Sequence, residues 1–360
     1  MQLSSQSVST QTGVERFLAA CQRQQTDTTP VWFMRQAGHC LAEYRALRES
    51  YDILTIARTP ELCSQVSLMP IAQYGVDAAV MYTDIILPFP GMGLQTELDP
   101  ARGPIVRNPV RTMQDVNALR VLAAEEATPF VMEAIRIVKQ ALARKQAVIG
   151  IAGGPFTLAL YMVEGVPTRD YSTAKTLMYQ HPDIWHALMN KITDVLVSYV
   201  QAEARAGADA IQLFDSNVGI LGPGAYIQFV QPYSRRVLAA IQQAGAQSIH
   251  FGTGHASLLP AMAQAGGDVI GVDWRVDIDQ AWQQIGSEHG IMGNLDPTLL
   301  LAPWETVSEG STAILDRLQR RPGHIFNLGH AVHPATNPDY LRRLVDAVHN
   351  YSVHTTTPTS

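Results

Sequence analysis

The feature that most restricts the fold of this chain is an alternation of short apolar runs with longer segments of helical spacing. Each run is rich in β-branched or other apolar residues and ends in a polar residue or glycine, a pattern typical of buried parallel strands. Many of the segments between them begin at proline and end in Ala-Gly, as helices with defined ends do. The apolar runs cover residues 30–34, 77–83, 147–152, 210–214, 248–252, 268–274, 290–294 and 324–328.

Eight strand and helix units in a chain of 360 residues predict an α/β protein, a single-domain (β/α)8 TIM barrel. Parallel strands need helical crossovers, and eight of them can close the sheet on itself. A doubly wound open sheet is the alternative fold for the same alternation. The Pro- and Gly-rich stretch 94–111 predicts an inserted hairpin after the second strand. The predicted helices cover residues 60–74, 129–144, 182–206, 232–244 and 338–350.

Composition favours one compact domain. Hydrophobic residues make up 46% of the chain and charged residues 16%, against roughly 25% charged residues in an average soluble protein. Only the two ends, residues 1–12 and 352–360, are rich in Ser, Thr and Gln without periodicity, and we expect them to be disordered. The barrel domain is therefore expected to span residues 13–351.

Charge and cysteine content argue against several classes of protein. The 32 acidic and 26 basic residues leave a net charge of −6, which disfavours broad binding to nucleic acid or to an anionic membrane. No run approaches the roughly 18 apolar residues of a membrane span. The N-terminus lacks the pattern of a secretory signal, and three scattered cysteines fit a reducing cytoplasm. Because only four of the bases are lysine, arginine is the main cation available to bind carboxylates or phosphates.

Polar residues at the ends of the apolar runs mark the predicted site. Barrel enzymes place their chemistry at the carboxyl ends of the strands, so these side chains are expected to line one cleft. The sequence has no motif of a serine hydrolase, a zinc protease or a P-loop protein, and its cysteines lack the spacing of a zinc site. Nothing in it requires a metal or an organic cofactor. The residues at or beyond the run ends are Arg35, Gln36, Ala37, His39, Asp84, Tyr161, Phe214, Ser216 and His330.

Five of these residues also have an ordinary structural role open to them. Arg35 could pair with an interior carboxylate, and Asp84 could cap a helix. Ser216 lies in Asp-Ser-Asn, which is also a helix-capping composition. Tyr161 falls in a predicted helix, where a tyrosine often only packs, and His330 could be an ordinary hydrogen-bonded histidine. Two aspartates, Asp273 near the end of the sixth run and Asp296 after the seventh, are expected to hold loops together.

The run that leads to Arg35 is more specific than a generic strand end. Its sequence Val-Trp-Phe-Met-Arg-Gln-Ala-Gly at residues 31–38, followed by Glu-Tyr-Arg at 43–45, resembles the N-terminal signature of the uroporphyrinogen decarboxylase family. The resemblance extends over about residues 14–351 and rests on six motifs in the family's order. The other motifs lie at residues 82–85, 154–158 with 161–165, 212–216, 293–297 and 327–330.

The resemblance implies a (β/α)8 barrel that works without cofactor or metal, usually as a homodimer. Members of the family convert the four acetate side chains of uroporphyrinogen III to methyl groups, which gives coproporphyrinogen III in tetrapyrrole biosynthesis. The resemblance further implies that Asp84 accepts hydrogen bonds from the pyrrole NH groups and that Asp84, Arg35 and Tyr161 are catalytic. The other substrate-binding residues that it implies are Gln36, Ala37, His39, Phe214, Ser216 and His330.

The chemistry of the implied reaction accounts for a central carboxylate. Loss of CO2 from a pyrrole acetate leaves a carbanion, unless a pyrrole carbon is protonated first and the ring becomes a cationic electron sink. A carboxylate beneath the ring, Asp84, would stabilise that cation. Arg35 could hold a substituent carboxylate through two hydrogen bonds. A guanidinium is a poor acid at neutral pH, so a water or a substrate carboxyl assisted by Arg35 is an alternative proton donor.

One residue departs from the family pattern. The family has a second signature arginine where this chain has His39, a shorter side chain that is only partly charged at neutral pH. The change could weaken binding of the substrate. It could also mark a divergent paralogue that acts on another acidic tetrapyrrole or aromatic substrate, or a non-catalytic tetrapyrrole-binding barrel. At the level of the sequence these alternatives stay open beside the decarboxylase.

Overall fold

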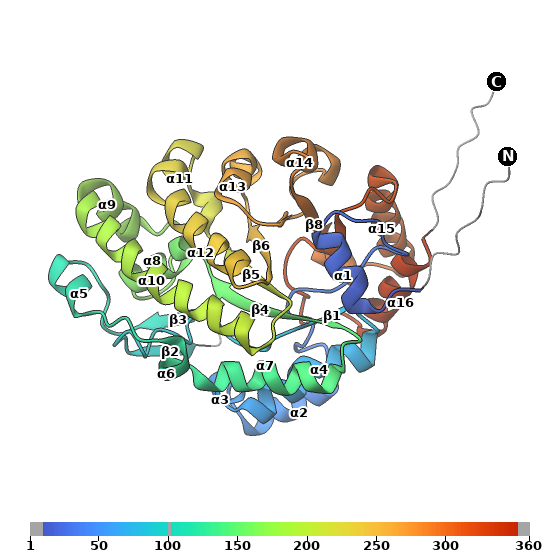
Figure 1. Cartoon of the computed structure of the whole chain (residues 1–360), viewed down its shortest axis with the longest axis horizontal. Helices are drawn as coiled ribbons and strands as arrows, with labels where there is room; N and C mark the ends of the chain where they lie inside the picture. Colours follow the sequence, from blue (N-terminus) through green and yellow to red (C-terminus); the bar gives the residue numbers. More distant parts are fainter. Residues whose placement is uncertain (1–9, 100–101, 352–360) are drawn as a thin grey trace.

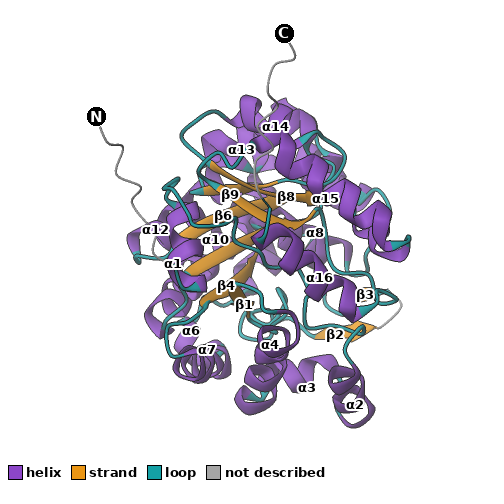
Figure 2. Ribbon diagram, turned by 90° about the vertical axis from the view of Figure 1, so that its right-hand side faces the viewer, coloured by secondary structure: helices purple, strands orange, loops and turns teal. Residues whose placement is uncertain are grey.

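The computed structural model describes residues 10–99 and 102–351 (Figure 1). Seven strands form one parallel sheet in the order β1-β4-β5-β6-β7-β8-β9, so each strand pairs with its successor along the chain. The strands lie at the centre of the molecule and the helices surround them (Figure 2). The strands are β1 (Ala78–Val80), β4 (Ala147–Gly153), β5 (Ala210–Asp215), β6 (Gln247–Gly252), β7 (Val269–Gly271), β8 (Gly290–Leu295) and β9 (His324–Leu328).

Seven of the eight predicted runs form these strands, but the first run, residues 30–34, does not. It joins β9 through a single parallel bridge between Val31 and Phe326. On its other side, Val31 O accepts a hydrogen bond from the amide of Asp77, just before β1. No regular ladder forms because side chains satisfy most of the amides of this segment. The amides of Val31, Phe33 and Met34 donate to Asp77 Oδ2 (2.7 Å), Gln36 Oε1 (3.0 Å) and Asn327 Oδ1 (3.2 Å).

Apolar side chains fill the barrel interior, and helix α1 (Gly13–Cys21) covers one end of it. Residues 30–34 lie between β9 and β1 and are called the closing segment below. Phe17 of α1 and Trp32 of the closing segment are fully buried among the interior side chains. The amide of Val14 donates to Lys145 O (3.2 Å), just before β4, so α1 covers the end at which the strands begin. The opposite end, where the strands finish, carries the predicted site residues.

The helices agree with the sequence prediction to within two residues at either end. The predicted segments 60–74 and 182–206 are α4 (Pro60–Tyr74) and α10 (Pro182–Ala206). The other three are α7 (Pro129–Leu142), α12 (Gln231–Gln243) and α16 (Pro338–His349). The remaining helices are α2 (Ala42–Ser50), α3 (Ile53–Arg58), α5 (Met113–Ala118), α6 (Ala124–Ala127), α8 (Pro155–Glu164), α9 (Ser172–Gln180), α11 (Pro223–Phe229), α13 (Leu259–Ala265), α14 (Ile278–Ile285) and α15 (Trp304–Leu318), with 3-10 turns η1 (Val218–Ile220), η2 (Ala256–Leu258) and η3 (Pro297–Leu301).

The predicted hairpin is present within residues 94–111. Its antiparallel strands are β2 (Thr96–Asp99) and β3 (Gly103–Val106). The amide of Val106 donates to Gly165 O (2.6 Å), and the amide of Val110 donates to Met162 O (2.9 Å). These bonds attach the hairpin and the chain after it to the C-terminal end of α8.

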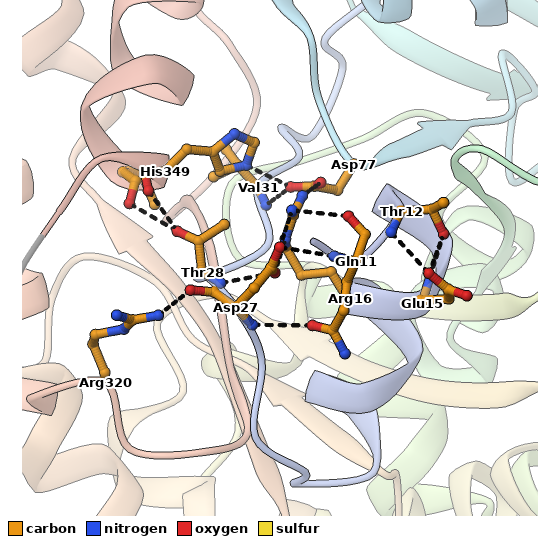
Figure 3. A network of polar contacts seen from close by, with 11 residues as sticks. Gln11, Thr12, Glu15, Arg16, Asp27, Thr28, Val31, Asp77, Arg320 and His349 are labelled. Atoms are coloured by element: carbon orange, nitrogen blue, oxygen red, sulfur yellow. Dashed lines mark hydrogen bonds and ion pairs between the residues drawn. The ribbon is translucent and has the colours of Figure 1, made fainter. Parts of the chain in front are cut away.

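A polar network ties the chain together where the strands begin (Figure 3). Asp77 is 3% exposed and accepts from Arg16 Nη1 of α1 (2.5 Å). It also accepts from the amide of Val31 (2.7 Å) and from His349 Nε2 of α16 (2.8 Å). Arg16 in turn donates to both carboxylate oxygens of Asp27 (2.7 and 2.8 Å). One buried carboxylate therefore joins α1, the closing segment, the start of β1 and the last helix.

The ends of the chain can be compared with the prediction only in part. Residues 1–9 and 352–360 of the predicted disordered ends lie outside the described residues. The amide of Gln11 donates to Asp27 Oδ2 (3.0 Å), and Thr12 caps α1 through a reciprocal pair of bonds with Glu15. Among the helices of the described ranges, none has the length and apolar character needed to cross a bilayer.

Candidate active site

Arg35 lies directly after the closing segment, in a loop that internal hydrogen bonds hold in shape. Its backbone has a φ of 54°, in the left-handed region, a conformation that costs a non-glycine residue about 1 kcal/mol or more. The neighbouring Gln36 is fully buried, and its Nε2 donates to Ala78 O at the start of β1 (2.9 Å) while its Oε1 accepts from Phe33. Ala37 is buried as well. The Gln36 side chain thus fixes the loop, and Arg35 itself is exposed.

Asp84 lies four residues beyond the end of β1 in a turn rather than at the start of a helix. Its Oδ1 accepts from the amide of Ile86 (3.0 Å), as a helix cap would, but residues 85–93 form turns and no helix begins there, so Asp84 does not cap a helix. The dense protein around Asp84 raises the pKa of its carboxyl, an effect that the Ile86 amide and the charge of Arg35 partly offset. The side chain still keeps some exposed surface, so it can reach a ligand.

Tyr161 is on α8, which follows β4 after the single linking residue Gly154. Its hydroxyl accepts from Asn217 Nδ2 at 3.4 Å. Burial raises the pKa of the phenol, and the charges of Asp84 and Arg35 act on it in opposite directions. The phenol is thus within electrostatic range of both charged residues, and it is partly exposed.

The end of β5 presents Phe214 and Ser216, both partly exposed. Ser216 is not a helix cap, because the residue that precedes η1 is Asn217. The carbonyl oxygen of Ser216 instead accepts from Thr253 Oγ1 (2.5 Å), which joins this loop to the one after β6.

Asp215, between Phe214 and Ser216, is fully buried. Its Oδ1 accepts from Thr157 Oγ1 of α8 (2.9 Å). Burial raises the pKa of Asp215 to about 6, although the Thr157 bonds oppose the shift. Gly154 leaves no room beside it, since a Cβ there would lie 2.6 Å from Asp215 Cγ. Close packing between β5 and α8 therefore sets the position of Tyr161.

His330 follows β9 and continues a row of aromatic rings. The ring of Phe251 lies 5.8 Å from that of Phe214 and 6.3 Å from that of His330, centroid to centroid. Surrounding protein lowers the pKa of His330, although the imidazole keeps an exposed face, and the charges of Arg35 and Arg275 lower it further. The imidazole is therefore neutral at neutral pH and can donate one hydrogen bond and accept another.

His39 is exposed and lies at the side of the site that contains Tyr82. Its ring meets Tyr44 edge to face with centroids 5.3 Å apart. The Tyr44 hydroxyl is 2.6 Å from that of Tyr82, which is two residues before Asp84. Arg45 Nη1 donates to the carbonyl oxygen of His39 (2.7 Å) and so holds its backbone.

The structure brings most of the predicted residues to one place. The charge of Arg35 acts on Asp84, Tyr161 and His330, and that of Asp84 acts on Tyr161. Phe214 joins them through Phe251, whereas the side chain of Gln36 is used inside the loop.

The two loop aspartates behave as predicted. Asp273 accepts from Gly254 and Arg275, and Asp296 accepts from the amide of Thr298 at the start of η3. Sequence reasoning missed Asn217, Phe251 and Arg275. Of these, Asn217 and Arg275 had a signal, since each lies shortly after or directly beside the end of an apolar run.

The arrangement suits an anionic substrate that becomes positively charged during the reaction. A guanidinium binds carboxylates, and a desolvated carboxylate stabilises a developing cation. Within residues 10–99 and 102–351, no three His, Cys, Asp or Glu side chains are grouped so that they could hold a metal ion.

A parallel barrel with these groups at the carboxyl ends of its strands is the architecture of a (β/α)8-barrel enzyme. The family model described as Uroporphyrinogen decarboxylase (URO-D) matches residues 12–351. The chain therefore belongs to the uroporphyrinogen decarboxylase family.

Curated relatives agree with this assignment. The chain is 46% identical over 338 residues to uroporphyrinogen decarboxylase of Carboxydothermus hydrogenoformans, covering 94% of this chain and 97% of that protein. It is 46% identical over 343 residues to the enzyme of Roseiflexus sp., covering 94% and 98%. Among solved structures, a methyltransferase from Methanosarcina mazei superposes with a TM-score of 0.81 over 94% of this chain and 98% of that one. At 20% identity that likeness shows the fold alone.

Proposed function

We propose that the protein catalyses the cofactor-independent decarboxylation of the four acetate side chains of uroporphyrinogen III to give coproporphyrinogen III. The observation that carries the proposal is Asp84, a desolvated but still reachable carboxylate within range of the Arg35 charge, in a chain of this family. An anion in such an environment stabilises a cation far better than one in water does.

The proposed reaction begins with protonation of a pyrrole carbon next to the one that bears the acetate. The ring becomes a cation, and Asp84 stabilises it while accepting hydrogen bonds from the pyrrole NH groups. The bond to the carboxylate then breaks, CO2 leaves, and its electron pair neutralises the ring as an exocyclic methylene. Protonation of that methylene gives the methyl group, and loss of the first proton restores the pyrrole. Each acetate thus exchanges CO2 for one proton.

Arg35 holds a substituent carboxylate near Asp84 through paired hydrogen bonds. A guanidinium is a poor acid, so the proton comes from water or from a substrate carboxyl that Arg35 holds. Tyr161, Ser216 and His330 bind and orient the other substituents, the last as a neutral imidazole. Phe214 provides an apolar surface for the macrocycle, and the loop of Gln36 and Ala37 positions Arg35.

The organisation that we propose with this function is a single barrel domain over residues 13–351 that acts as a homodimer in the cytoplasm, without cofactor or metal. The family resemblance supports each of these points. Light scattering on the purified protein tests the dimer. Activity that survives dialysis against a chelator tests the absence of a metal requirement, and activity restored only by an added metal would overturn it.

An anaerobic assay tests the function itself. Purified protein is incubated with uroporphyrinogen, and CO2 release is followed together with the number of carboxylates in the product. Four CO2 per substrate and a tetracarboxylate product are expected. Tight binding without turnover would favour a non-catalytic tetrapyrrole-binding barrel. Neither binding nor turnover would favour a divergent paralogue with another acidic substrate, the alternative to which His39 points.

A further inference from the structure

Arg275 lies just beyond β7 in a fixed position that the proposed reaction has not used. Its Nη1 donates to Asp273 Oδ2 (2.6 Å), and its guanidinium lies over the ring of Trp274, 4.0 Å from the centroid. The Asp273 carboxylate is also bound by the amides of Arg275 and Gly254 (3.0 and 2.6 Å). Asp273 is 1% exposed, whereas the side chain of Arg275 is 50% exposed. A buried anion and an aromatic face thus hold a cation that still faces solvent.

The loop of Arg275 is packed against the loop of His330. A Cβ on Gly329 would lie 2.5 Å from the backbone nitrogen of Trp274, so the two loops touch through the backbone. The charges of Arg275 and Arg35 both act on the imidazole of His330. Arg275 therefore lies at the edge of the candidate site, on the side of His330.

The free edge of this guanidinium suits a carboxylate. Within the described residues, its hydrogen bonds are made through Nη1 alone, which leaves Nε and Nη2 as a pair of parallel donors. Such a pair binds both oxygens of a carboxylate. The bond to Asp273 and the stack on Trp274 fix the side chain beforehand, so little rotamer freedom is lost when a ligand binds.

We propose that Arg275 is a second carboxylate clamp, which binds a peripheral carboxylate of the tetrapyrrole on the His330 side of the macrocycle. This inference rests on the proposed function, whose substrate carries eight carboxylates. It adds a permanent cation to a site in which position 39 is a histidine. Arg275 would therefore determine specificity for the acidic substrate, while Asp84 carries the chemistry at the centre.

Porphyrin binding tests the clamp separately from turnover. The dissociation constants of uroporphyrin, with eight carboxylates, and coproporphyrin, with four, are measured by fluorescence for the wild type and for Arg275→Gln. We expect Arg275→Gln to weaken uroporphyrin binding about ten- to a hundredfold, the range for a lost charge-assisted pair. In turnover, KM for uroporphyrinogen should rise more than kcat falls. Equal weakening for both porphyrins would assign the clamp to a propionate, and weakening for uroporphyrin alone would assign it to an acetate.

Arg236→Gln is the matched control, because Arg236 also bonds to one aspartate at 2.6 Å and is 45% exposed, but on the outer helix α12. Its affinities should stay within twofold of the wild type. Affinities of Arg275→Gln within twofold for both porphyrins would overturn the clamp.

If Arg275→Gln lowers the thermal unfolding midpoint, porphyrin binding by Arg275→Lys is measured as well. Lysine keeps the charge beside Asp273 but has no planar pair of donors. Weaker binding by threefold or more supports the clamp, and unchanged affinity overturns it. An inactive wild type whose porphyrin binding still depends on Arg275 would refute the proposed function and leave the clamp standing.

Discussion

Asp84 differs from a surface aspartate in that protein surrounds it and only one of its oxygens receives a backbone hydrogen bond. Asp84→Ala should therefore lower kcat by at least about 10²-fold, the effect of removing a preorganised charge from a site of this kind. The fold should persist, because the hydrogen bond of the Asp84 side chain is to Ile86 in the same turn and not to another helix or strand. Anaerobic CO2 release measures the rate, and circular dichroism checks the fold. Substantial residual activity in a folded variant would remove Asp84 from the central role.

The raised pKa of Asp84 has a consequence for pH dependence. The reaction needs the ionised carboxylate, so kcat/KM should fall as pH decreases through a pKa above the ordinary aspartate value of about 3.9. Asp215 is a control, because burial raises its pKa to about 6 although it faces Thr157. Asp215→Asn should retain the acidic limb of the profile. If the fall of kcat/KM at low pH disappears in Asp215→Asn, the group that titrates is Asp215 and not Asp84.

His39 is exposed and its ring meets that of Tyr44 edge to face, so there is space for a longer side chain. His39→Arg should lower KM for uroporphyrinogen about threefold to tenfold, the gain from one charge-assisted hydrogen bond. Steady-state kinetics under anaerobic conditions measure it. An unchanged KM would show that the missing cation does not limit binding.

The positions of most site residues were predictable because they lie at or shortly beyond the end of an apolar run, and barrel geometry brings such positions together. The side chains that contact these site residues could not be predicted in the same way. Asn217 reaches Tyr161 from 56 residues away, and Phe251 completes the aromatic row between Phe214 and His330 from a different strand. Contacts of this kind depend on loop shapes that local sequence does not encode.

At the scale of elements, the segment 30–34 is where the prediction of a strand was wrong. Its composition is that of a strand, but Asp77 and Asn327 supply side-chain acceptors from 46 and 293 residues away. Hydrophobic periodicity reports which residues are buried and not which atoms satisfy their amides. The helices could be predicted well because Pro60 and Gly75 mark boundaries within the sequence itself.

The packing of α8 on β5 gives a prediction at the same scale. Gly154→Ala would place a Cβ 2.6 Å from Asp215 Cγ, so it should reduce the free energy of unfolding by about 1–3 kcal/mol and lower kcat/KM by moving Tyr161. Urea unfolding and the anaerobic assay measure the two effects. Gly224→Ala on α11 is the control, because nothing lies within 4 Å of a Cβ there. Equal stability of the two variants would contradict the argument.

At the scale of the whole molecule, the Asp77 network joins the two ends of the described chain (Figure 3). Asp77→Ala leaves Arg16 without one of its partners and the Val31 amide unpaired, and it should reduce the free energy of unfolding by about 3–5 kcal/mol. Glu97→Ala removes an ion pair with Arg107 that is exposed to solvent, so it should change stability far less than Asp77→Ala does. Chemical denaturation measures the free energy of unfolding of both variants. Similar decreases would show that Asp77 contributes no more to stability than an exposed ion pair does.

The side-chain closure of the barrel also bears on how members of this fold can diverge. In a regular strand, moving a residue toward a ligand means shifting the register by two, which displaces every neighbour. Arg35 instead leaves a segment whose amides are held by Asp77, Gln36 and Asn327. We expect substitution of Gln36 or Asn327 to shift Arg35 while the seven-stranded sheet keeps its register, whereas Asp77 also holds α1 and α16 and cannot be changed so cheaply. The closing segment is therefore a place where evolution, or a protein engineer, can alter substrate preference with little disturbance to the sheet.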